Sequence, residues 1–147
     1  MRRFSRIFAW TTLFFVAGAV LFFTKAAALP YKVAWPVLLL SLATFLSRRR
    51  ELLPFGFAFL FSAAGDAVGA RGLFIPQMAF FALAHVAYVC WFLPRARRRL
   101  RAVSLAVTVP LLVFLFAAIV PEAPFPAERI GVAVYGLVIA AMLYSAL

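Results

Sequence analysis

One acidic residue lies inside an apolar stretch of this sequence. Asp66 follows Ser62 by four residues, so the two side chains share a helix face, and Gly69 continues that face. A carboxyl in apolar surroundings favours its protonated form and can act as a general acid. The alternative is structural, in which Asp66 pairs with Arg71 near a helix end or caps the last turn.

A second set of polar residues follows at helical spacing. Gln77, Phe81, His85 and Tyr88 fall on one face of a helix. We expect this stripe to face the bundle interior, towards the helix that carries Asp66. The alternative for His85 is a neutral core histidine that is hydrogen-bonded to a carbonyl or hydroxyl.

Tyr135 is the third candidate. It lies about 9 Å below the outer surface if Arg129 marks that surface, a depth similar to that of Asp66. Its alternative is an interfacial tyrosine with a satisfied hydroxyl. The single histidine and single cysteine form no ligand-pair spacing, so we expect no metal and no cofactor. Nucleophile-elbow and phosphate-loop patterns are absent from the sequence as well.

Long apolar runs must position these residues. The chain is 67% hydrophobic and 13% charged, far from a soluble domain. A membrane helix needs ~20 apolar residues, and lipid offers backbone groups no partner, which favours helices. We therefore predict an all-α, polytopic transmembrane bundle of about six spans, forming one domain over residues 1–147. The runs are Ile7–Thr24, Val33–Leu46, Leu52–Ala70, Gly72–Leu93, Ala102–Val120 and Ile130–Leu147.

The net charge of +11 could indicate nucleic-acid binding, but the basic residues lie between the apolar runs, so we expect no nucleic-acid partner. Alternate connections carry 11 and 4 basic residues. The positive-inside rule then places the N-terminus in the cytoplasm, and we expect a bacterial inner membrane. Alternatively, the first run is a cleaved signal peptide that ends near Ala26–Ala28.

Three stretches resemble signatures of the YhhN-type lysoplasmalogenase family. They are Phe59–Asp66, the aromatic-rich Phe81–Tyr88 with its A-H-x-x-Y, and Val134–Tyr135–Gly136 followed by Ala141–Met142 and Ala146. The family commonly has Lys-Pro in the second helix, where this chain has Trp35–Pro36. Its members are usually longer and carry a second serine-aspartate signature in a later helix. We therefore expect either a fragment or a shortened member that lacks activity.

The resemblance implies hydrolysis of the vinyl ether bond of a lysoplasmalogen, a membrane lipid, to a fatty aldehyde and a glycerophospho-headgroup compound. It implies Asp66 as the general acid, with His85 or Tyr135 orienting water or the ether oxygen. Ser62, Gln77 and Tyr88 are the expected substrate contacts. Two alternatives stay open: a non-catalytic membrane protein that forms part of a larger bundle, and a small transporter or channel. The transporter has the weaker basis, since permeation of polar solutes usually needs more intramembrane polar groups. Oligomeric state and headgroup are not encoded in any pattern here.

Overall fold

A computed structural model describes residues 2–23, 33–47, 49–96 and 100–147. Within these ranges the chain forms helices and no strands, which confirms the predicted all-α fold. The long helices, one for each predicted run, are α1 (Arg2–Phe23), α2 (Ala34–Leu46), α3 (Leu53–Gly69), α4 (Phe74–Phe92), α5 (Arg101–Phe114) and α6 (Pro126–Ala146). Short turns extend them: η1 (Arg50–Leu52), η2 (Leu93–Arg95), the π-helical η4 (Leu115–Ile119) and η5 (Val120–Glu122).

The described helices are apolar enough for an integral membrane protein. Four helical stretches are long and apolar enough to cross a bilayer by length and composition, namely Arg50–Gly69, Phe74–Arg95, Arg101–Glu122 and Pro126–Ala146. Helix α2 is apolar but has only 13 residues. At 1.5 Å per residue it is about 20 Å long, shorter than the ~30 Å hydrocarbon core.

Proline and glycine set several helix ends. Pro36 lies in the first turn of α2, and Pro54 and Pro126 lie at the starts of α3 and α6. Proline is tolerated there because the first N–H groups of a helix have no intrahelical partner. The turn between α3 and α4 contains Gly72 with φ of 74°, a left-handed conformation that glycine adopts without steric cost.

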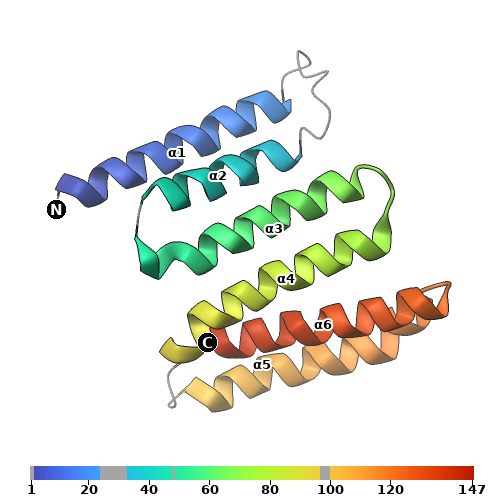
Figure 1. The fold of residues 1–147 in the computed structure, drawn as a ribbon. Helices are drawn as coiled ribbons and strands as arrows, with labels where there is room; N and C mark the ends of the chain where they lie inside the picture. The colour runs from blue at the N-terminus through green and yellow to red at the C-terminus, as the bar shows by residue number, and fades with distance from the viewer. Residues whose placement is uncertain (1, 24–32, 48, 97–99) are drawn as a thin grey trace.

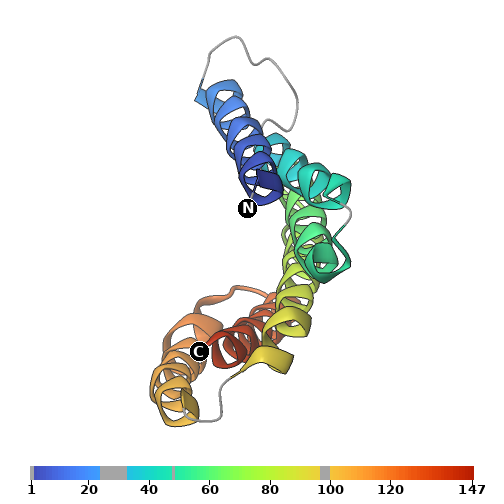
Figure 2. The same cartoon turned by 90° about the vertical axis from the view of Figure 1, so that its left-hand side faces the viewer.

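The helices form a curved row rather than a closed ring. Helix α1 packs on α2, α2 on α3 and α3 on α4, but α6 lies between α4 and α5, so α5 is at the far end of the row (Figure 1). Seen along the helices, the row bends into an arc that is open on one side (Figure 2).

A glycine lies at each of the five contacts between neighbouring helices, and the contact between α3 and α4 has two. The pairs are Gly18 with Pro36, Gly56 with Phe45, Gly65 with Phe81, Gly69 with Gln77, Gly131 with Met78, and Gly136 with Leu115. Lipid tails are as apolar as the helix surfaces, so burial of apolar surface does not by itself drive helices together in a membrane. Small residues let two helices approach closely, and the resulting van der Waals contact stabilises the pair. Ser41 adds an interhelical hydrogen bond, since its hydroxyl donates to the carbonyl of Gly56 at 2.8 Å.

Candidate functional site

Helix α3 presents Ser62 and Asp66 on one stripe. At about 100° per residue, Asp66 projects between the α4 contact at Gly65 and the α2 contact at Gly56. Phe57, which is 45% exposed, projects from the opposite side of the helix. Ser62 and Asp66 are both half-buried, on the side of the row opposite to this exposed phenylalanine.

The carboxyl of Asp66 has no polar partner among the described residues. The ion pair seen in this part of the chain joins Arg49 and Glu51 instead. The structural alternative, a pair with Arg71 or a cap on the last turn, is therefore not the arrangement seen in the described ranges. The backbone carbonyl of Asp66 accepts a bond from the Ala70 N–H, as in any helix. The side chain is left available for another group.

Helix α4 contacts both of its neighbours from one half of its surface. Phe81 packs on Gly65 of α3, and His85, only about 40° away around the helix, contacts Tyr135 of α6. The row therefore bends towards this side of α4, which makes it concave there. We call this side the concave face; it is formed by Ser62, Asp66, Phe81, His85, Tyr88 and Tyr135.

The predicted polar stripe of α4 divides between its neighbours. The side chain of Gln77 lies against Gly69, and the ring of Tyr88 lies 5.6 Å from Phe55 and 6.4 Å from Phe59, so both contact α3 as predicted. The prediction that His85 faces α3 is wrong. Its ring lies 5.5 Å from that of Tyr135, edge to face, because its place on the helix turns it towards α6.

The hydrogen bond of His85 assigns its tautomer. Its Nδ1 lies 2.6 Å from the carbonyl oxygen of Phe81, one turn earlier. A carbonyl can only accept, so Nδ1 carries the proton and donates. In this tautomer Nε2 carries no proton and is an acceptor. The structural alternative, a histidine that is hydrogen-bonded to a carbonyl, therefore applies to Nδ1. Nε2 stays available for another partner.

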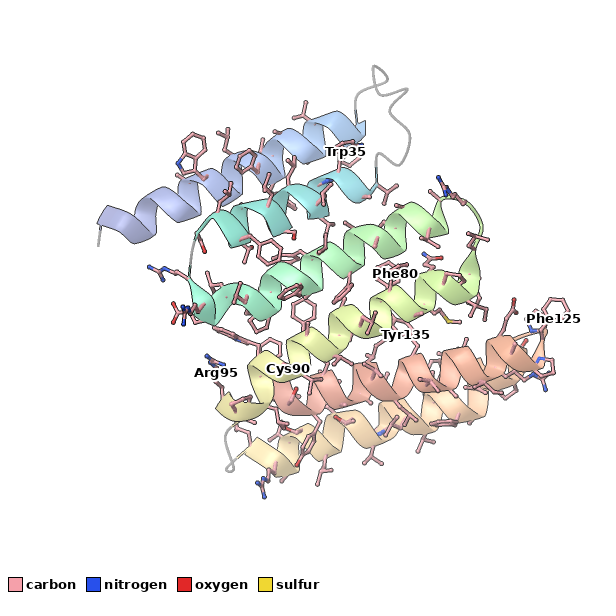
Figure 3. All side chains as sticks on the ribbon, in the orientation of Figure 1. Trp35, Phe80, Cys90, Arg95, Phe125 and Tyr135 are labelled. Carbon is pink, nitrogen blue, oxygen red and sulfur yellow. The ribbon has the colours of Figure 1, made fainter. Side chains whose placement is uncertain are left out.

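Tyr135 lies between α4 and α6 (Figure 3). It lines a cavity of about 440 Å³ together with Gln77. Asp66 does not line this cavity, and α4 separates its helix from α6 (Figure 1). Asp66 is one residue from Gly65, opposite Phe81, and Tyr135 is one turn after Gly131, opposite Met78. The two residues therefore lie at similar depth, as predicted, on either side of α4.

One feature of the site was not predicted from the sequence. The π-helical segment Leu115–Ile119 contributes Leu115 and Ile119 to the cavity wall, although this part of the chain reads as one uninterrupted apolar run. Pro110, inside α5, was the one available signal of an irregular helix. Within the described residues, no three side chains of His, Cys, Asp or Glu come close enough to hold a metal ion.

Comparison with known proteins gives one match. The model of the YhhN family matches residues 28–147, which include α2 to α6 and every residue of the concave face. No curated protein and no solved structure matches the chain. With a family match over most of its length and the helices of a membrane protein, the chain belongs to the YhhN family.

Proposed function

We propose that this protein is a membrane-embedded hydrolase that cleaves the vinyl ether bond of lysoplasmalogens. The observation that carries the proposal is the concave face, where a carboxyl without a described polar partner lies at the same depth as a histidine–tyrosine pair. Ionisable groups at such depth are costly and usually functional. Membership of the YhhN family supports the same reading.

The proposed reaction needs one acid and one water. Protonated Asp66 delivers its proton to the vinyl carbon that is not bonded to oxygen, which leaves an oxocarbenium ion and the Asp66 carboxylate. Water adds to the cationic carbon, and the carboxylate takes up the proton that water releases. The resulting hemiacetal breaks its bond to the glycerol oxygen. The products are a fatty aldehyde and the glycerophospho-headgroup alcohol, and Asp66 is again protonated.

The other residues of the concave face have supporting roles in this proposal. Nε2 of His85 is the free acceptor that can orient the attacking water. The hydroxyl of Tyr135, beside His85, can donate to the ether oxygen. Ser62 and Tyr88 of this face, together with Gln77 of the neighbouring cavity, would contact the lipid around the reacting bond. Glu122 and Glu128 lie at the junction of η5 and α6, away from this face, and have no role here.

Asp66→Asn tests the acid role, because it keeps the shape and removes the transferable proton. We expect aldehyde release from a lysoplasmalogen to fall by on the order of 10²–10⁴ while thermal stability is kept. Glu122→Gln neutralises an exposed carboxyl elsewhere and is the matched control, with unchanged rate. An Asp66→Asn protein as fast as wild type removes Asp66 from the mechanism. A wild-type chain that releases no aldehyde overturns the hydrolase proposal for this chain.

A non-catalytic role within a larger helical assembly is the second candidate, and the open arc of helices favours it (Figure 2). In that case Asp66 bonds to another chain across the concave face. Asp66→Asn would then change the oligomeric state or the stability rather than a rate. Light scattering and thermal unfolding on the same purified samples separate the two candidates.

A further inference from the structure

An arginine that follows α4 is folded back onto an aromatic ring. The guanidinium carbon of Arg95 lies 3.6 Å from the centre of the Trp91 ring, and its Nη1 donates to the Trp91 carbonyl oxygen at 2.8 Å. Trp91 in turn packs edge to face on Phe55 of α3, with 4.9 Å between the ring centres. Cation–π attraction holds a guanidinium over a tryptophan ring. The Arg95 side chain is therefore fixed in place although it is exposed.

This stack of side chains lies where two helical stretches that can span a membrane end. The stretches that contain α3 and α4 end at Arg50 and Arg95, and the two helices run antiparallel (Figure 1). Arg95 lies one turn after Trp91, and Arg50 just over one turn before Phe55, so the ring contact places both arginines at the same end. Figure 3 shows Arg95 at this end of α4. In a bilayer, this end of the two helices meets the lipid headgroups.

The charge of Arg95 is not balanced by an acidic group among the described residues. Of the four acidic residues in the sequence, Glu51 is the one at this end, and it pairs with Arg49 at 3.5 Å. A guanidinium carries several N–H donors, of which the contact with the Trp91 carbonyl uses one. Its planar fork matches two oxygens of a phosphate group. Arg95 therefore presents a fixed and uncompensated phosphate-binding group.

We propose that Arg95 binds the phosphodiester of an anionic bilayer phospholipid in the leaflet at this end. Basic sites between membrane helices bind such headgroups. Arg95 borders an open groove between η2 and the end of α6, which Phe92 and Leu100 also line and which has no acidic side chain in its walls. A headgroup therefore has space beside the guanidinium. Because Trp91 fixes the guanidinium before the lipid arrives, less side-chain entropy is lost on binding.

This lipid is a different molecule from the proposed substrate. Along α4, Arg95 lies about 15 Å from the level of His85 and about 21 Å from that of Phe81, which is also the level of Asp66. Within one phospholipid, only the glycerol backbone separates the phosphate from the bond that would be cleaved, and this is a much shorter distance. A lipid held at Arg95 therefore keeps its own ether or ester bonds away from Asp66. The inference does not rest on the proposed function.

Titration of the purified full chain with phosphatidylglycerol in a neutral detergent tests the proposal, with bound lipid counted by native mass spectrometry. Arg95→Gln removes the guanidinium, and Arg95→Lys keeps the positive charge but loses the planar fork. Arg101→Gln removes the same charge from an exposed position at the same end and is the matched control. Trp91→Leu leaves Arg95 in place but removes the ring beneath it. Melting temperatures of the four variants check that each is folded.

We expect the dissociation constant for phosphatidylglycerol to rise about tenfold in Arg95→Gln, and severalfold in Arg95→Lys and Trp91→Leu, because each loses part of a charge-assisted, two-pronged contact. Arg101→Gln should bind like the wild type, and phosphatidylcholine, which has no net charge, should bind far more weakly. An equal loss in Arg95→Gln and Arg101→Gln overturns the proposal, because the general positive charge of this end would then explain binding. Equal binding of the two lipids also overturns it. So does displacement of the lipid by inorganic phosphate or glycerol phosphate, because the site would then bind a soluble anion.

Discussion

At the scale of single residues, the two nitrogens of His85 have separate tasks. Nδ1 donates to the carbonyl of Phe81 at 2.6 Å and so fixes the ring on its own helix. Nε2 has no hydrogen-bond partner among the described residues, and in the proposed reaction it is the acceptor that orients water. The ring is also held edge to face against Tyr135 at 5.5 Å, a geometry that aromatic pairs favour. Structure and function in this residue can therefore be separated by substitution.

Asparagine and glutamine each imitate one of these nitrogens. His85→Asn keeps a donor near the position of Nδ1, and His85→Gln places a polar group near that of Nε2. We expect His85→Asn to keep thermal stability but to lose aldehyde release by on the order of 10², and His85→Gln to retain the larger share of activity. Rates and melting temperatures of the two proteins check this. Equal rates in both would show that Nε2 has no part in the reaction.

At the scale of elements, α5 is the helix least like an ideal one. It contains Pro110, and it continues into the π-helical segment that packs on α6. Ser104 and Thr108 are its buried polar residues, four apart on one stripe. The hydroxyl of Ser104 donates to the Leu100 carbonyl at 3.1 Å, whereas Oγ1 of Thr108 has no hydrogen-bond partner among the described residues. A buried hydroxyl without a partner lowers stability.

Thr108→Val replaces this hydroxyl by a methyl group of similar size. Removing the unsatisfied group should stabilise the fold by about 1 kcal/mol, seen as a higher apparent melting temperature. Ser104→Ala is the matched control on the same stripe, and it should give no gain because it removes a hydroxyl that is already bonded. A lower melting temperature for Thr108→Val would mean that the hydroxyl bonds a group outside the described residues.

At the scale of the whole molecule, charge and topology agree. In Figure 1 the start of α1, the end of α2 and the starts of α3 and α5 lie on one side of the molecule, and the end of α3 and the starts of α4 and α6 lie on the opposite side. Arg95 and Phe125 mark these two sides (Figure 3). The described basic residues of the first side are Arg2, Arg3, Arg6, Arg49, Arg50, Arg95 and Arg101, and those of the second side are Arg71 and Arg129. The sequence count of 11 and 4 also includes Lys25, Lys32, Arg48 and residues 97–99, which lie outside the described residues.

From this asymmetry we propose that the N-terminus lies in the cytoplasm and that the membrane is a bacterial inner membrane. Reporter fusions after Arg50 should report the cytoplasm and fusions after Arg71 the periplasm, because basic loops are retained inside. Replacing Arg49 and Arg50 by neutral residues should weaken the cytoplasmic preference of the α2–α3 connection. Replacing Arg129 by a neutral residue is the control and should leave the orientation unchanged. A periplasmic signal after Arg50 together with a cytoplasmic one after Arg71 would reverse the proposed topology.

The sequence by itself determined the helices, because long apolar runs in lipid have one way to satisfy their backbone. The sequence also predicted that Gln77 and Tyr88 contact α3 and that Asp66 and Tyr135 lie at similar depth. Both predictions use only the rise of 1.5 Å and the rotation of about 100° per residue, which are properties of a single helix. Only the tertiary structure decided the position of α6 between α4 and α5, the turn of His85 towards Tyr135, and the cavity at the π-helical segment. Lipid-facing and buried residues are both apolar here, so hydrophobic pattern carries little information about neighbours. Side-by-side order came instead from close approach at glycines such as Gly131 and Gly136, whose partners lie far along the chain.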